Sequence, residues 1–211
     1  LSETTLTRAT FQWADLRSAK MRRASIERAS FAAADLRGFD LTFAMHANHV
    51  QFDRALLTDT HIADAVLPDA SFMGCDIRGT VWEFCTLTRS NFLDVRTRGG
   101  RVTMVDVQAD FANLFSVDLS NALFTGPVSL EGADLRYAKF RGAELRGLRA
   151  QRARARKVGV RVAAARDRRG EVARAHVQRA EGKRRHAQRP RAAHLAAAPP
   201  LRRGAVAAQC C

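Results

Sequence analysis

A five-residue period is the feature of this sequence that most constrains its fold. In the stretch GADLRYAKFRGAELRG, residues 132–147, an alanine recurs every five residues, and each is followed two positions later by a large apolar residue. An α-helix repeats every 3.6 residues and a β-strand every two, so neither element by itself produces this spacing. A period that fits neither element indicates a tandem repeat.

The repeat extends through most of the chain as a large apolar centre with a small residue two positions before it. Twenty-six centres can be counted from Leu6 to Leu145, and all are apolar. The small partner is Ala, Val, Thr, Ser or Cys in 25 of these repeats, and Phe39 is the exception. We expect both positions to point inward, which predicts a core that includes Phe11, Leu16, Phe31, Leu36, Phe52, Phe72, Ile77, Trp82, Phe92, Leu135, Phe140, Leu145, Ala133, Ala138 and Ala143.

Two inward positions in every five suit a short extended segment followed by a bend. Four such segments would close a square coil of 20 residues, so residues 20 apart should stack. Phe52, Phe72 and Phe92 have this spacing, which supports a ladder of side chains inside a stacked coil. Stability would then accumulate coil by coil, because each coil of a solenoid contacts only its neighbours. The 26 repeats predict about six to seven coils.

The clearest form of the motif, Ala-Asp-Leu-x-x, resembles that of the pentapeptide-repeat proteins. It occurs as ADLRS at 14–18, ADLRG at 34–38 and ADLRY at 133–137. The resemblance covers about 4–147 and implies an all-β fold, a right-handed four-sided (quadrilateral) β-helix solenoid. The family also contains proteins that mimic nucleic acid, bind type II topoisomerases and protect them from inhibitors.

The phase of the repeat slips three times, at 44–49, 96–101 and 125–127. We expect bulges or short loops there, since the Gly and Pro of the second and third slips are turn residues. Insertions in repeat folds often carry binding specificity. The alternative is that these are surface insertions that the fold tolerates and that have no function. The candidate interaction residues in these loops are His46, His49, Arg98, Gly99, Gly100, Arg101, Gly126 and Pro127.

The composition changes after residue 147. Residues 148–211 contain no aromatic residue and carry a formal charge of +15, whereas residues 1–147 carry −1. We therefore predict a pentapeptide-repeat β-helix over 1–147 and an Arg/Ala-rich low-complexity tail over 148–211. Three interpretations of the tail stay open: a disordered or partly helical extension, a basic arm that binds nucleic acid through its phosphates, and a stretch read out of frame from a GC-rich gene.

Few residues point to chemistry. Cys75 and Cys85 occupy the small inward position and are expected to fill the core, as free Cys often does. Arginines that follow centres are expected to point outward: Arg17, Arg37, Arg78, Arg136, Arg141 and Arg146. Aspartates that precede centres are expected to satisfy the backbone of turns rather than to form acid–base pairs: Asp15, Asp35, Asp40, Asp76, Asp118 and Asp134.

A metal site can be considered at His46 and His49, which form an H-x-x-H pair. Such a site needs further ligands, for which Asp53 and His61 are conceivable, and a solvated loop is the favoured interpretation. No nucleophile–base constellation, phosphate-binding loop or bilayer-spanning apolar run occurs in the sequence. We therefore predict no metal, no cofactor and no enzymatic activity.

Two classes of function fit these observations. The first is a non-enzymatic scaffold that presents solenoid faces to a protein partner, in the cytoplasm or as an exported factor, within a larger bacterial protein, since the repeat is already running at Leu6. The second is a nucleic-acid mimic that binds a type II topoisomerase. The near-neutral charge of residues 1–147 weighs against mimicry, which needs a dominant negative potential. Nucleic acid would be a partner only if the basic tail is genuine.

Overall fold

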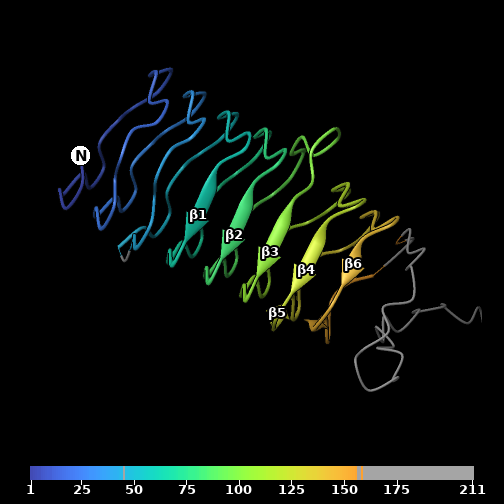
Figure 1. The fold of residues 1–211 in the computed structure, drawn as a ribbon. Coiled ribbons are helices and arrows are strands. Elements are labelled where there is room, and N and C mark those ends of the chain that lie inside the picture. The colour runs from blue at the N-terminus through green and yellow to red at the C-terminus, as the bar shows by residue number, and fades with distance from the viewer. Residues whose placement is uncertain (45, 156–157, 159–211) are drawn as a thin grey trace, which may run out of the picture. The chain divides into compact units, whose positions relative to one another are not determined.

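The computed structural model describes residues 1–44, 46–155 and 158, and within them the chain winds into a β-solenoid without an α-helix (Figure 1). The stacked coil expected from the five-residue period and the β-helix implied by the resemblance are confirmed. One parallel sheet contains five strands: β1 (His61–Ala63), β2 (Val81–Glu83), β3 (Thr103–Val105), β4 (Leu123–Thr125) and β6 (Glu144–Leu145). A second parallel sheet pairs β5 (Val128–Ser129) with β7 (Leu148–Arg149).

Parallel ladders run along the described coils, one on each side of the coil. We number the four sides in chain order. The ladders of sides one to four begin at Thr5, Thr10, Asp15 and Lys20, respectively. The ladder of the second side is continuous and pairs eight residues in parallel: Thr10, Ser30, Gln51, Ser71, Asn91, Asn113, Asp134 and Arg154.

The second slip lengthens one coil, and the ladder of the fourth side continues across it. His61 pairs with Val81, a separation of 20 residues. Val81 then pairs with Thr103, a separation of 22, because the second slip at 96–101 adds two residues to that coil. The solenoid therefore absorbs this insertion within one coil, and the next coil resumes the register.

The corners are β-turns with a positive φ at the third residue, a feature of type II turns. The backbone N–H of Ala9 donates to the carbonyl of Leu6 at 3.0 Å, and Arg8 between them has a φ of 60°. A positive φ costs a non-glycine residue roughly 1–2 kcal/mol. The cost is offset because the same residue bonds to the next coil, as the Arg8 N–H does to Glu27 O at 2.8 Å.

The interior contains a column of stacked aromatic rings from successive coils. Neighbouring rings in the column are 4.9–5.3 Å apart between centroids and within 12° of parallel, and the column comprises Phe11, Phe31, Phe52, Phe72 and Phe92. Among the predicted core residues, Phe11 and Leu16 of the first coil are partly buried, and the other thirteen are buried. No buried side-chain nitrogen or oxygen of the described residues lacks a hydrogen-bond partner.

Two inward positions were missed by the repeat count. Ala47 in the first slip and Thr97 in the second are buried at centre positions. The Thr97 hydroxyl donates to the backbone carbonyl of Asp118 in the next coil. An alanine and a hydroxyl residue do not look like large apolar centres, so the sequence pattern passes over both.

Backbone pairing continues past residue 147, where the β-helix was expected to end. β7 pairs with β5, and Arg154 pairs with Asp134 in the preceding coil. The expected boundary followed the last large centre, Leu145, but a ladder of backbone hydrogen bonds does not require an apolar centre. The remainder of the predicted tail, 156–157 and 159–211, lies outside the described residues.

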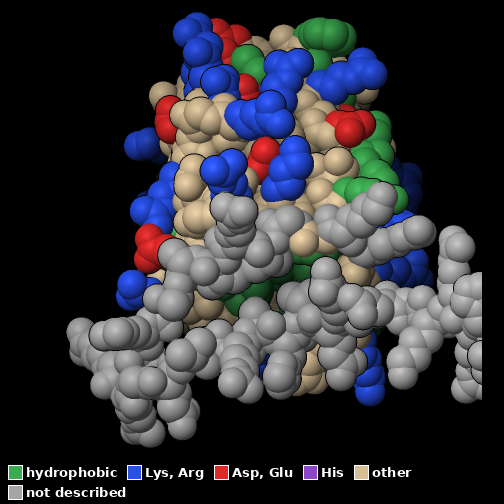
Figure 2. Space-filling model, turned by 90° about the vertical axis from the view of Figure 1, so that its right-hand side faces the viewer, with side chains coloured by type: hydrophobic (Ala, Val, Ile, Leu, Met, Phe, Trp, Pro, Cys, Tyr) green, Lys and Arg blue, Asp and Glu red, His purple; other side chains and the backbone are tan. Residues whose placement is uncertain are grey.

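Charged side chains occupy the outward positions. Figure 2 shows one face of the molecule, on which blue lysine and arginine side chains lie among red carboxylates. Residues 1–155 contain 20 Lys or Arg and 18 Asp or Glu. Opposite charges are thus interspersed over the coils.

Candidate interaction surface

The histidines considered for a metal site do not gather ligands. Among residues 1–44, 46–155 and 158, no group of three or more His, Cys, Asp or Glu side chains could hold a metal ion. The His61 ring lies 3.0 Å from the Glu83 carboxylate, and Asp53 accepts the backbone N–H of Met73 at 3.1 Å. The two further ligands that we considered therefore have partners on neighbouring coils.

The two cysteines of the repeats lie in the core as free thiols. Cys75 and Cys85 are both buried. Burial raises the pKa of Cys85 to about 11 and raises the pKa of Cys75 as well. Because the thiolate is the reactive form of cysteine, neither residue offers a nucleophile at neutral pH.

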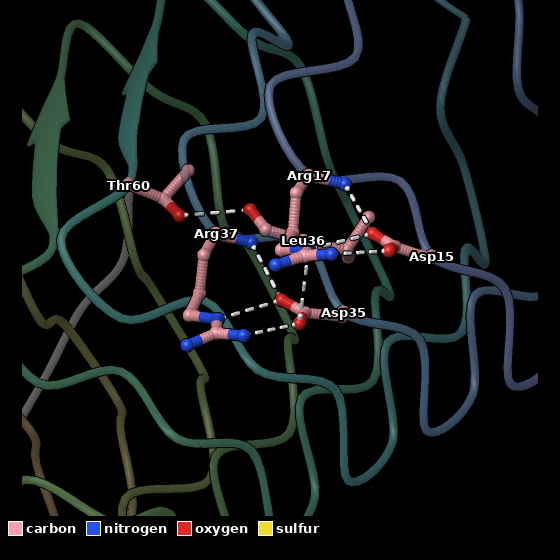
Figure 3. A network of polar contacts seen from close by, with 6 residues as sticks. All are labelled: Asp15, Arg17, Asp35, Leu36, Arg37 and Thr60. Atoms are coloured by element: carbon pink, nitrogen blue, oxygen red, sulfur yellow. Dashed lines mark hydrogen bonds and ion pairs between the residues drawn. The ribbon is translucent and has the colours of Figure 1, made fainter.

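The third side carries a row of aspartate–arginine pairs (Figure 3). Arg17 donates from Nη2 to Asp15 Oδ2 at 2.6 Å, and Arg37 makes the same bond to Asp35 in the next coil. Arg17 Nε also lies 3.7 Å from Asp35 Oδ2, which links the two pairs. Each arginine stands two residues after its aspartate on one extended segment, so both side chains point outward.

The aspartates of the repeat also satisfy turn backbone, as expected. Each accepts a hydrogen bond from the N–H of the residue two positions later, at 3.1–3.3 Å, and the set is Asp15, Asp35, Asp40, Asp76, Asp118 and Asp134. These carboxylates therefore support the backbone of the coil.

Burial differs along the row of pairs. The Asp76 side chain is 5% exposed beside Arg78, whereas the Asp15 side chain is 59% exposed beside Arg17. Hydrogen bonds from Arg17 lower the pKa of Asp15 to about 2. Burial alone would raise the pKa of Asp76, but the hydrogen bonds from the side chain and backbone of Arg78 outweigh it, so this pKa is also lowered.

The arginines of the second slip bind to the following coils. Arg98 Nε lies 3.4 Å from Asp118 Oδ2, and Arg101 Nη2 lies 2.6 Å from Glu144 Oε1. Gly100 is packed so closely that a Cβ there would lie 2.6 Å from the backbone nitrogen of Gly79. The remaining slip residues that we predicted for interaction are exposed, namely His46, His49, Gly99, Gly126 and Pro127.

The second side carries a strip of outward apolar side chains, which we call the apolar band. Three of them directly follow the centres of successive coils, and two flank them at the corners; the members are Met73, Leu93, Phe115, Phe111 and Tyr137. Phe111 is 63% exposed. The rings of Phe115 and Tyr137 meet edge to face with centroids 5.4 Å apart.

A shallow groove of about 570 Å³ lies at one end of the apolar band. One wall is apolar, formed by Leu93, Phe111 and Phe115. The charged lining of the groove is formed by Asp134, Arg136 and Arg154. This groove combines aromatic surface with arginines, two features that are enriched in protein interfaces.

Comparison with known proteins agrees with the coil geometry. A family model described as pentapeptide repeats matches in eight copies, over residues 1–23, 112–147 and 128–158. The matched segments of the chain are pentapeptide repeats. No curated protein matches the sequence. Among the described residues, none forms a helix that could span a membrane.

Solved structures of QnrB1, described as a plasmid-mediated fluoroquinolone resistance protein, share the fold. A trypsin-treated variant superposes with a TM-score of 0.65 at 17% identity, covering 74% of this chain and 89% of that one. The full-length protein gives a TM-score of 0.56 at 15% identity, covering 74% and 93%. At 15–17% identity, the likeness shows that this chain and QnrB1 have the same fold.

The apolar band is a candidate interaction surface that the sequence analysis did not predict. The position after the centre is mixed in the repeat, since Asp53 and Arg136 occupy it as well as Leu93. Its apolar members are 20 or 22 residues apart and become neighbours only when the register of the coils is known. Aligning the repeats by coil, with two extra residues at the second slip, would have placed Leu93 beside Phe115.

Proposed function

We propose that this pentapeptide-repeat protein is a non-enzymatic scaffold that binds a protein partner through the second side of its solenoid. The apolar band supports the proposal, because apolar side chains gathered at a protein surface mark interaction sites, and Met73, Phe111 and Tyr137 of the band are exposed. The ladder beneath the band holds its side chains one coil apart, so less conformational entropy is lost on binding. The buried thiols and arginine-paired carboxylates are consistent with a non-enzymatic role.

Photo-crosslinking tests this proposal. A photoreactive amino acid replaces Phe115 in the full chain, and the matched control carries it at Phe84, an aromatic residue that is 57% exposed at the corner after the fourth side. We expect a discrete protein adduct from position 115 that disappears when Leu93→Asp is added. The same adducts from both positions would show that the apolar band has no special role.

A second candidate is binding to a type II topoisomerase. The fold shared with QnrB1, a fluoroquinolone resistance protein, favours it. Charge weighs against it, because a nucleic-acid mimic needs a dominant negative potential to compete for a basic groove. Residues 1–155 contain slightly more basic than acidic side chains, and the aspartates of the third side are paired with arginines.

A supercoiling assay with gyrase and relaxed plasmid separates the two candidates. We expect that a chain ending at residue 158 neither inhibits supercoiling at micromolar concentration nor protects gyrase from a fluoroquinolone. The chain has to end there, because residues 159–211 contain 13 Lys or Arg and could bind plasmid directly. Inhibition by the shortened chain that persists in high salt would favour mimicry over the scaffold.

A further inference from the structure

The groove at the end of the apolar band presents a defined combination of surfaces. We infer that it binds a peptide segment of a partner protein in which a carboxylate lies next to large apolar side chains. This inference rests on the proposed function and specifies the chemistry of the partner. The inference rests on the apolar and the charged residues that line the groove, and on the excess of positive charge among the charged ones.

Two rings of the apolar lining pack against residues of the next coil. The Phe111 ring lies over Gly132 of the next coil so closely that a Cβ on Gly132 would be 2.5 Å from the ring. Phe115 is held by its edge-to-face contact with Tyr137. Aromatic side chains of this kind, already ordered, offer apolar contact area to a partner at little further entropic cost.

The charged lining contains more positive than negative charge. Arg136 donates to both oxygens of Asp134, at 2.8 and 2.6 Å, and its guanidinium lies 5.3 Å from the centre of the Phe115 ring. Arg154 lies beside Asp134 in the ladder, is exposed, and forms no ion pair within the described part of the chain. Arg136 bonds to both Asp134 oxygens, and Arg154 interacts with the same carboxylate through its charge alone, so the two arginines carry one more positive charge than Asp134 neutralises.

A guanidinium beside an aromatic wall selects a carboxylate with apolar neighbours. Arginine binds carboxylates through two parallel hydrogen bonds, which adds geometric specificity to the charge attraction. A basic segment would meet Arg154 with like charge, so the chain's own residues 159–211, with 13 basic and three acidic side chains, are a poor occupant. One uncompensated cation is also too few for a nucleic-acid backbone, which needs several phosphate contacts.

Fluorescence anisotropy with three labelled peptides tests the inference on the full chain. The peptides are short, share the same Leu and Phe residues, and carry Asp, Lys or Ser at the positions between them. We expect the Asp peptide to bind about tenfold more tightly than the Lys peptide, with the Ser peptide between them. Equal affinities, or preference for the Lys peptide, would overturn the inference.

Substitutions locate the binding site. Arg154→Glu should reverse the preference between the Asp and Lys peptides, whereas Arg8→Glu, an exposed arginine of the first coil, should leave it unchanged. Phe115→Ser should weaken all three peptides alike, with the melting temperature confirming that each variant is folded. A preference that Arg154→Glu does not alter overturns the inference.

The peptide experiment and the crosslinking experiment test the inference and the proposed function independently. If no peptide binds while position 115 still yields its adduct, the inferred partner chemistry is wrong and the scaffold proposal stands. If neither the peptides nor the crosslink gives a signal, both the inference and the proposal are overturned.

Discussion

Phe72 lies in the middle of the aromatic column, with its ring centroid 5.0 Å from that of Phe52 and 4.9 Å from that of Phe92. Trp82 meets it edge-on from the same coil at 5.3 Å. At the residue scale, position within the five-residue unit decides whether a side chain enters this interior or reaches solvent. The same residue type therefore has opposite energetic consequences at different positions, as Phe72 and the exposed Phe84 illustrate.

Phe72→Asp is expected to destabilise the fold by about 4 kcal/mol or more, because it leaves a cavity and buries an unpaired carboxylate. Phe84→Asp makes the same change at an exposed corner, where we expect an effect within about 0.5 kcal/mol. Chemical denaturation of both variants measures the difference. Similar losses of unfolding free energy at the two positions would contradict the assignment of inward and outward positions.

An outward arginine matters when it covers a buried carboxylate. Arg78→Ala should lower the melting temperature at neutral pH by about 2–4 °C, because the buried Asp76 carboxylate loses the hydrogen bonds from the Arg78 side chain. Arg17→Ala is the matched control, since Asp15 in the same kind of pair remains solvated and should cause a smaller change. Equal changes in melting temperature for the two variants would show that the burial of the aspartate is irrelevant.

The effect of Arg78→Ala should depend on pH in a defined direction. The pKa of Asp76 is lowered in the folded protein, so the stability contributed by its pair with Arg78 is present above about pH 4 and is lost as the pH falls through the folded-state pKa. The difference in melting temperature between the natural chain and the variant should therefore shrink from pH 7 to pH 3. A difference that grows in acid would contradict this linkage.

At the scale of elements, the coil corners accommodate the inserted residues. The second slip adds two residues between Asp76–Arg96 and Val81–Thr103, and both pairings are retained. Two adjacent glycines make this possible for different reasons. Gly99 has a φ of 93° with open space around it, whereas Gly100 has no room for a Cβ beside Gly79 and Arg78.

Alanine substitutions separate conformational strain from steric exclusion in this slip. Gly99→Ala should cost about 1–2 kcal/mol, the penalty of a positive φ for a residue with a Cβ. Gly100→Ala should cost more, because its Cβ would approach the backbone nitrogen of Gly79 to 2.6 Å and the backbone of one coil has to shift. Urea unfolding measures both. A larger loss for Gly99→Ala would mean that the loop yields freely at Gly100.

At the scale of the whole molecule, the solenoid extends as far as its ladders are paired. The backbone N–H of Leu135 donates a hydrogen bond to the backbone carbonyl of Arg154 at 2.9 Å. β7 likewise covers β5. The last described coil is thus part of the same stacked structure, although it lacks large apolar centres.

Truncation locates the end of the solenoid. A chain that ends at residue 158 retains every described contact and should melt at the same temperature as the full chain. A chain that ends at 147 loses β7 and the Arg154–Asp134 pairing and should melt at a lower temperature. Thermal unfolding followed by circular dichroism compares the three chains. Equal melting temperatures for the chains that end at 147 and 158 would show that residues 148–158 contribute nothing to stability.

The sequence by itself determined the inward positions and the class of fold. The inward pair is set within each five-residue unit, so alternation of large and small residues such as Leu135 and Ala133 can be read locally. The aspartate turns could be predicted for the same reason, because Asp134 bonds to the backbone only two residues away.

Only the tertiary structure decided which outward residues become neighbours. Leu93 and Phe115 lie side by side because the register accumulates over a whole coil, including the two extra residues of the second slip. The polar centre Thr97 and the pairing at Arg154 depend likewise on contacts with another coil. The pairing at Arg154 joins residues 20 positions apart through backbone hydrogen bonds, which any residue except proline can donate. The Thr97 hydroxyl bonds to a backbone carbonyl 21 positions away, so no local pattern of side chains reports either contact.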